Sequence, residues 1–187
     1  MTDKNVSIMN IGSMGYLPQV FKKIENEKKL NIVYLGGSIT MGCNATKTEL
    51  RYVDRSAKWW QTNFPDAEIS YFNAGIGATT SQFGVARVQE HVLDKQPDLV
   101  FVEFSVNDSS SPLFMETYES LVRRLLKAES VKAVVLINNL FYDTGTNAQG
   151  IHNAIGLHYD LPIVSVRNYI FPCLLYTSPS PRDRTRS

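Results

Sequence analysis

The chain has 187 residues, 43% of them hydrophobic, which is typical of one domain with a single sizeable core. Its formal net charge is +1, from 19 basic and 18 acidic side chains, so charge gives no reason to expect nucleic acid or an anionic membrane surface as a partner. No segment reaches the roughly 18 consecutive apolar residues that a membrane span needs, and the first residues lack the pattern of a secretory signal. We therefore expect a cytoplasmic protein that acts on a small neutral ligand.

The two cysteines, Cys43 and Cys173, are far apart in the sequence and have neither the spacing of metal ligands nor that of a disulfide framework. We expect both to be free thiols, and we expect the protein to bind neither a metal nor a cofactor. No feature of the sequence specifies an oligomeric state.

Strand and helix patterns alternate along most of the chain. Apolar runs typical of buried strands occupy residues 32–35, 68–73, 99–104, 133–137 and 162–166. Apolar residues at helical spacing occupy residues 17–24, 51–63, 83–93, 115–128 and 146–158. This alternation predicts a three-layer α/β fold with a doubly wound parallel sheet of about five strands.

A serine follows the first predicted strand at a tight turn. The two glycines before Ser38 let the backbone turn sharply, which places Ser38 at the carboxyl edge of the sheet, where open α/β sheets bind their ligands. The lipase-type motif Gly-x-Ser-x-Gly is absent, because Thr40 stands where the second glycine is required. A P-loop is absent too, because Cys43 and Asn44 replace the lysine and the hydroxyl residue that hold phosphate and magnesium.

The next two predicted strands also end in turns that carry hydrogen-bonding groups. Residues 68–73 lead into Gly75-Ile76-Gly77-Ala78, and residues 99–104 lead into Ser105-Val106-Asn107-Asp108. Ends of neighbouring parallel strands meet at one edge of a sheet, so we expect both turns beside Ser38. Acyl transfer needs a nucleophile and donors for the oxyanion. Ser38 can be the nucleophile, and a backbone N–H of the second turn and the Asn107 amide can be the donors.

These three segments resemble the conserved blocks of the SGNH (GDSL-like) hydrolases. Gly-Gly-Ser-Ile-Thr resembles the first block, with Gly37 where many members carry aspartate, and Asn-Ala-Gly-Ile-Gly-Ala resembles the second. Val-Glu-Phe-Ser-Val-Asn-Asp resembles the third, with Ser105 in place of a glycine. The resemblance covers residues 32–166 and implies the flavodoxin-like SGNH hydrolase fold and an ester hydrolase.

The resemblance also implies roles for individual residues. Ser38 would attack the ester, and the oxyanion would be held by the Ser38 N–H, a backbone N–H of Gly77 or Ala78, and the Asn107 side chain. Many members carry glycine at the position of Ala78. Residues expected to shape the substrate cleft are Gly37, Thr40, Asn44 and Asp108. The form of the blocks resembles carbohydrate-deacetylating esterases, so the expected substrate is a small-molecule or carbohydrate-borne acyl ester, such as an acetyl ester.

One block of the family has no counterpart in this chain. The family takes its catalytic aspartate and histidine from Asp-x-x-His, and this spacing does not occur in the sequence. The three histidines, His91, His152 and His158, fall in predicted helices, where a side chain is poorly placed to act as a base for Ser38. We therefore expect very low esterase activity from this chain.

The absence of that block leads to an expected domain boundary. We expect residues 1–172 to form an esterase domain that is incomplete at its carboxyl end and lacks a final helix. Residues 173–187, rich in proline, serine and arginine, are expected to be a non-native disordered tail, with a native disordered tail as the alternative.

Two other functions are compatible with the sequence. Gly75-x-Gly77-x-x-Thr80 follows a strand and opens a helix, as in dinucleotide-binding proteins, although the third glycine is missing. A catalytically silent interaction domain is the other alternative. The site residues also have structural interpretations, because hydroxyls cap helices and asparagine and aspartate favour turns. Glu103, in a predicted buried strand, needs a partner, for which Arg87 or a backbone group would serve.

Overall fold

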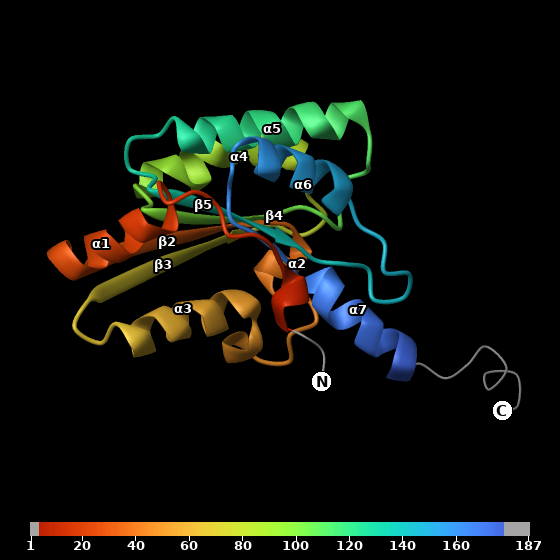
Figure 1. The fold of residues 1–187 in the computed structure, drawn as a ribbon, viewed down its shortest axis with the longest axis horizontal. Helices are drawn as coiled ribbons and strands as arrows, with labels where there is room; N and C mark the ends of the chain where they lie inside the picture. Colours follow the sequence, from red (N-terminus) through yellow and green to blue (C-terminus); the bar gives the residue numbers. More distant parts are fainter. Residues whose placement is uncertain (1–3, 178–187) are drawn as a thin grey trace, which may run out of the picture.

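A computed structural model gives the fold of the chain and describes residues 4–177 (Figure 1). The strands are β1 (Ile8–Asn10), β2 (Lys29–Gly36), β3 (Glu68–Gly75), β4 (Leu99–Glu103), β5 (Ala133–Asn138) and β6 (Ile163–Ser165). The α-helices are α1 (Leu17–Glu27), α2 (Ser38–Met41), α3 (Tyr52–Asn63), α4 (Ser81–His91), α5 (Pro112–Leu126), α6 (Gln149–His158) and α7 (Val166–Thr177). Short 3₁₀ helices are η1 (Lys4–Ser7), η2 (Thr48–Leu50) and η3 (Leu93–Lys95).

The strands form one sheet in the order β1-β6-β5-β4-β2-β3. Neighbours from β6 to β3 pair in parallel, and β1 pairs with β6 antiparallel. The predicted doubly wound parallel α/β fold is therefore confirmed, with six strands in place of about five. The additional strand β1 is only three residues long and two of them are exposed, so it leaves no apolar periodicity in the sequence.

Helices cover both faces of the sheet. Helices α4, α5 and α6 lie on one face, and α1, α3 and α7 lie on the other (Figure 1). Successive residues of a strand point to opposite faces, so Val134 and Leu136 pack in one hydrophobic cluster while Val135 packs in the other. Burial on both faces explains why the strands read as continuous apolar runs.

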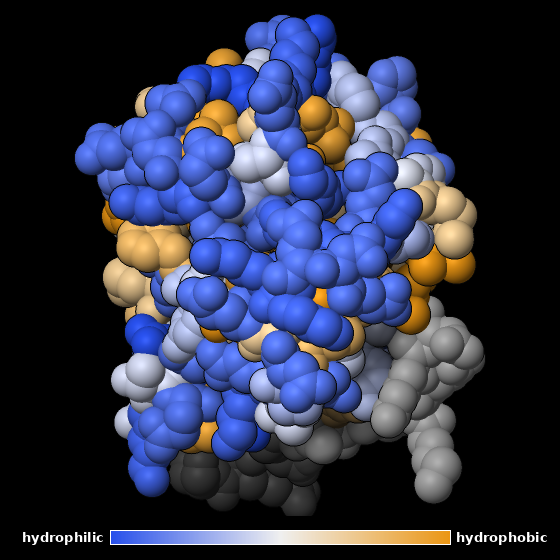
Figure 2. Space-filling model, turned by 90° about the vertical axis from the view of Figure 1, so that its left-hand side faces the viewer, coloured by the Kyte–Doolittle hydropathy of each residue, from blue (hydrophilic) through white to orange (hydrophobic). Residues whose placement is uncertain are grey.

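The two ends of the sheet differ in character. The strands run toward α2, so their carboxyl ends lie at that end of the molecule (Figure 1). The opposite end, which Figure 2 shows facing the viewer, is predominantly hydrophilic, with hydrophobic residues in small separate patches. The recess at this end is small, about 120 Å³, and the predicted site lies at the other end of the sheet. Among the described helices, none is long and apolar enough to cross a membrane.

The carboxyl end of the described chain is helical. Helix α7 follows β6 directly and continues past Pro172 to Thr177, whereas the sequence predicted that the folded domain ends at residue 172 without a final helix. The predicted boundary rested on the change in composition after residue 172, which does not show that the first residues beyond it continue a helix. The helix is anchored by Phe171, whose ring lies where a side chain on Gly145 would lie. The rest of the predicted tail, residues 178–187, lies outside the described residues.

Candidate active site

The first and third predicted turns meet at the end of β2. Ser38 is the first residue of α2 and is half-buried, and the N–H of Gly37 donates to the carbonyl of Glu103 at 3.3 Å. The amide oxygen of Asn107 lies 2.9 Å from the point that a Cβ on Gly37 would occupy. The Asn107 side chain therefore lies against the turn that presents Ser38. A larger residue at position 37 would displace it.

The second turn packs on the other side of α2. Asn73 donates from Nδ2 to the carbonyl of Thr40 at 2.8 Å, and its Oδ1 accepts the N–H of Gly75 at 2.9 Å. A Cβ on Gly75 would lie 2.2 Å from the backbone nitrogen of Met41, so only glycine allows this close approach. Gly77 lies beside the Met41 side chain. The three turns predicted from the sequence are thus brought together around α2. Asn73 was not among the predicted site residues, although it stands in the second block.

The backbone of the second turn explains a departure from the family pattern. Ala78 has φ +56°, in the left-handed region that glycine adopts without strain. The glycine that many members carry here suits this conformation. Ala78 is exposed, so its methyl group causes no packing conflict and the backbone N–H keeps its place in the turn.

Arg87 of α4 is buried beneath these turns. Its Nη1 donates to the carbonyl of Ala74 at 2.7 Å and its Nη2 donates to the carbonyl of Gly36 at 3.1 Å, so one guanidinium joins the ends of β3 and β2. Burial lowers the pKa of Arg87 to about 10, which leaves it protonated at neutral pH. The sequence named Arg87 as a candidate partner of Glu103, whereas its Nη atoms bind these two backbone carbonyls and Nδ1 of His91. The position of a charged residue on the buried side of a helix was the sequence feature that indicated a structural role for Arg87.

Glu103 ends β4 on the buried side of the same edge. Its side chain is fully buried, its Oε1 accepts the Ser105 hydroxyl at 3.1 Å, and burial raises its pKa to about 7. Ser105 Oγ in turn accepts the N–H of Asn139 at 2.8 Å. Ser105, which replaces a glycine of the family pattern, therefore connects the end of β4 to the end of β5.

Two residues expected in the substrate cleft are buried structural residues. Thr40 is fully buried and its hydroxyl shares a hydrogen bond of 2.8 Å with the hydroxyl of Tyr52. The Asp108 carboxylate is also fully buried, and it accepts the N–H of Ser81 at 2.9 Å and a hydrogen bond from His152 at 3.1 Å. Both corrections have one cause, since the sequence places a residue in a turn but does not give the direction of its side chain.

The histidines lie away from Ser38. His152 is fully buried, with its ring stacked on Tyr118 at 3.6 Å between centroids, and burial lowers its pKa, so it is neutral at pH 7. His91 lies beside Arg87, and His158 is exposed at the end of α6. In the described part of the chain, no histidine lines the cleft next to Ser38.

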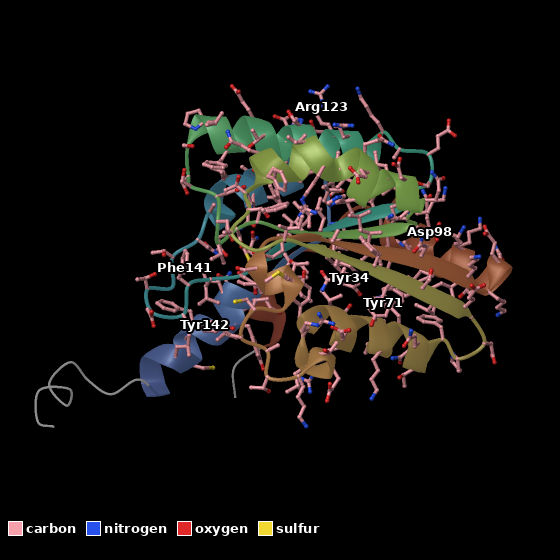
Figure 3. All side chains as sticks on the ribbon, turned by 180° about the vertical axis from the view of Figure 1, so that it is seen from behind. Tyr34, Tyr71, Asp98, Arg123, Phe141 and Tyr142 are labelled. Atoms are coloured by element: carbon pink, nitrogen blue, oxygen red, sulfur yellow. The ribbon has the colours of Figure 1, made fainter. Side chains whose placement is uncertain are left out.

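A cleft begins at Ser38 and crosses the sheet between α3 and α7. Its volume is about 980 Å³. Its sheet floor is apolar and consists of Phe101, Val135, Ile137 and Val164. Asn44 lies on the wall of this cleft, whereas Gly37, Gly77, Ala78 and Asn107 are not among the lining residues. Phe141 and Tyr142, 53% and 61% exposed, lie at its mouth on the loop between β5 and α6 (Figure 3). No sequence pattern predicted this aromatic pair, because it lies in an irregular loop.

The geometry argues against a dinucleotide at the second turn. A phosphate in such proteins binds the free N–H groups at the start of the following helix. Here that helix is α4, and its first N–H, on Ser81, already donates to Asp108. The close approach of Gly75 to Met41 fills the other side of the turn. These two contacts occupy the first N–H of α4 and one side of the turn, which disfavours a dinucleotide phosphate there.

Ser38 follows β2 and Asn107 follows the neighbouring strand β4, which is the order of blocks that the resemblance to the SGNH hydrolases implies. The model of the GDSL-like lipase/acylhydrolase family matches residues 34–182, and the chain belongs to this family. The family is one of lipases and acylhydrolases. The matched region ends within the segment that the sequence predicted as a tail.

Solved structures extend the comparison. A two-domain esterase (CEX) active on acetylated mannans is 45% identical with a TM-score of 0.90, and the match covers 96% of this chain and 48% of that chain. The same esterase co-crystallised with mannopentaose matches with the same identity and TM-score over 96% of this chain and 49% of that chain. This chain therefore spans about half the length of that esterase. A catalytic mutant of the acetylxylan esterase Axe2 from Geobacillus stearothermophilus is 18% identical with a TM-score of 0.65 over 80% and 81% of the two chains, which shows a shared fold. No curated protein sequence matches the chain.

Proposed function

We propose that this chain is the esterase domain of an enzyme that removes acyl groups, acetyl foremost, from carbohydrates. The observation that carries the proposal is the Asn107 side chain lying against Gly37, the residue before Ser38, at the strand ends beside a cleft large enough for sugar residues. The likeness to an esterase active on acetylated mannans supports the carbohydrate as the alcohol part of the substrate.

In the proposed reaction, the Ser38 Oγ attacks the carbonyl carbon of the ester and forms a tetrahedral intermediate. The negative oxygen of this intermediate is held by the N–H of Ser38, which as the first helical residue has no intrahelical acceptor, by the N–H of Gly77 or Ala78, and by the Asn107 amide. Collapse of the intermediate expels the sugar hydroxyl and leaves an acyl-serine. Water then attacks the acyl carbon, releases the carboxylic acid and restores Ser38.

Proton transfer limits this chain. The Ser38 proton needs an acceptor within hydrogen-bond reach, and the described residues place no histidine in the cleft. We therefore include very low activity in the proposal for this 187-residue chain. The alcohol part of the substrate is assigned to the cleft between α3 and α7, where the exposed rings of Phe141 and Tyr142 offer stacking surfaces for a sugar ring.

The test is release of acetate from p-nitrophenyl acetate and from acetylated mannan. We expect slow hydrolysis that is lost in Ser38→Ala, and Asn107→Ala to lower the rate about 10²-fold or more, because it removes one oxyanion donor. Ser120→Ala, an exposed serine on α5, is the matched control and keeps the starting rate. An Asp-x-x-His block added after Thr177 is expected to raise the rate. Hydrolysis that survives Ser38→Ala would refute the assignment.

A further inference from the structure

The turn that carries Asn107 is short and is anchored on both sides of Asn107: the Ser105 carbonyl accepts the N–H of Ala148 at 2.7 Å, and the Asp108 carboxylate accepts the N–H of Ser81. The N–H groups of Asn107 and Asp108 both donate to the carbonyl of Phe104, at 3.0 and 2.9 Å. This pair of bonds closes the turn directly after β4. Asp108 is next to Asn107 in the chain, so a shift of its carboxylate would turn the Asn107 side chain as well.

Two donors hold the Asp108 carboxylate. Its Oδ1 accepts the N–H of Ser81 at the start of α4, and its Oδ2 accepts the Nε2–H of His152 from α6 at 3.1 Å. The side chains of Asp108 and His152 are both 0% exposed. A buried carboxylate without its donors is strongly destabilised, so both bonds are needed to keep this one in place.

The packing and the tautomer of His152 allow its ring to act as a fixed hydrogen-bond donor. Its ring stacks on Tyr118 with an interplanar angle of 5°, and its Nδ1 has no hydrogen-bond partner in the described structure. A neutral imidazole carries one proton, and the bond to Asp108 requires that proton on Nε2. The ring is enclosed between the carboxylate and Tyr118 and does not line the cleft, so it cannot reach a substrate bound at Ser38.

We propose that His152 is a positioning residue for the oxyanion hole: by holding Asp108 it fixes the turn that presents the Asn107 amide to Ser38. This pair of an aspartate and a histidine thus acts on the turn and not on the proton of Ser38. The inference rests on the proposed function, because it assigns a purpose to the placement of Asn107.

The test compares two amides at position 152. In His152→Gln the side-chain nitrogen can occupy the place of Nε2 and donate to Asp108, whereas the shorter side chain of His152→Asn cannot reach it. Tyr118→Phe is the control in the same cluster, because the Tyr118 hydroxyl is buried without a partner among the described residues and the stacked ring is kept. The main readout is the side-chain NH₂ signals of Asn107 in the ¹⁵N-labelled protein, assigned by their loss in Asn107→Ala.

We expect the Asn107 signals to stay in place in His152→Gln and Tyr118→Phe, and to shift and broaden in His152→Asn. Ser38-dependent hydrolysis of p-nitrophenyl acetate is expected to fall about 10²-fold in kcat in His152→Asn with little change in KM, because a donor displaced by about 1 Å loses transition-state contact. His152→Gln is expected to retain the rate, which glutamine could not do if His152 were the base.

Unmoved Asn107 signals in a folded His152→Asn protein would overturn the proposal. So would loss of hydrolysis in His152→Gln with unmoved signals, since that result would make His152 the base. If the unsubstituted chain shows no Ser38-dependent hydrolysis, the proposed function fails for this chain and the signals still decide the inference. If His152→Asn does not fold, Asp108→Ala replaces it, because it removes both acceptor oxygens, and it is expected to move the same signals.

Discussion

The two faces of the sheet differ in how completely helices cover them. On the face of α4, α5 and α6, Leu136 and its neighbours are fully buried in one continuous cluster. On the opposite face, α1 and α3 cover β2 and the start of β4, but Ile137 and Val164 are only partly buried and form the floor of the cleft. One strand, β5, therefore supplies core residues to one side and cleft residues to the other.

This difference separates stability from binding. A residue that packs against helices on every side contributes its full transfer free energy and leaves a cavity when it is shortened. A residue that borders the cleft has open space on one side and contributes less. We expect the covered face to determine stability, and we expect the open face to tolerate changes that alter the shape of the cleft.

The largest expected effect compares two adjacent residues of β5. Leu136→Ala is expected to lower the free energy of unfolding by about 2–5 kcal/mol, because it opens a cavity in the buried cluster. Ile137→Ala, on the open face, is expected to cost about 1 kcal/mol, because only part of its side chain leaves water on folding. Urea denaturation followed by circular dichroism measures both values.

If Leu136→Ala and Ile137→Ala lowered the free energy of unfolding equally, the two faces would not differ in coverage. That result would mean that the open face is covered in solution. Repeating the denaturation over a range of protein concentrations identifies a covering copy of the chain. In that case the midpoint rises with concentration, whereas a monomer gives a constant midpoint.

The next effect concerns the buried carboxyl of Glu103 at the end of β4. Its pKa of about 7 lies above the ordinary value of 4.5, so the folded state binds the proton more tightly than the unfolded state. Its contribution to stability is present below pH 4.5 and is lost as the pH rises through 7. We expect Glu103→Gln to gain about 3 kcal/mol relative to the unsubstituted chain between pH 4.5 and pH 8.

The difference in free energy of unfolding between Glu103→Gln and the unsubstituted chain reports on Glu103 alone and not on His152. Burial lowers the pKa of His152, so its contribution has the opposite sign and is lost as the pH falls below the ordinary value of 6.5. Both proteins contain His152, and its contribution cancels in the difference. A difference that stays constant from pH 4.5 to pH 8 would show that Glu103 titrates as an exposed carboxyl does.

The sequence was sufficient for the layers of the fold and for the three turns. Continuous apolar runs identify strands buried on both faces, and parallel order places their carboxyl ends at one edge, so Ser38 and Asn107 could be predicted as neighbours. Strand β1 was missed because three residues at a sheet edge show no pattern. The uncovered part of the sheet could not be predicted, because a strand residue beside a cleft is as apolar as one beneath a helix.

The predicted site was least accurate where side-chain direction decides the role. Thr40 and Asp108 stand in the right turns but point into the protein, and the sequence does not distinguish the two directions. The roles of Arg87 and His152 depend on contacts between residues far apart in the chain. His152 and Asp108 are 44 residues apart and meet only when α6 packs against the end of β4.

The smallest expected effect comes from comparing an alanine in the turn beside Ser38 with an alanine in helix α4, which follows that turn. Ala78, at φ +56°, occupies a conformation that costs an alanine about 1–2 kcal/mol, whereas glycine adopts it freely. Glycine also has more conformational freedom in the unfolded chain, which lowers the free energy of unfolding by about 0.4–1 kcal/mol. We therefore expect Ala78→Gly to raise the free energy of unfolding by about 0.5–1 kcal/mol.

Ala86→Gly, exposed within α4, is the matched control and is expected to lower the free energy of unfolding by about 1 kcal/mol. The same substitution thus has opposite signs eight residues apart, and a loss of stability in both variants would show that the left-handed turn beside Ser38 is not strained.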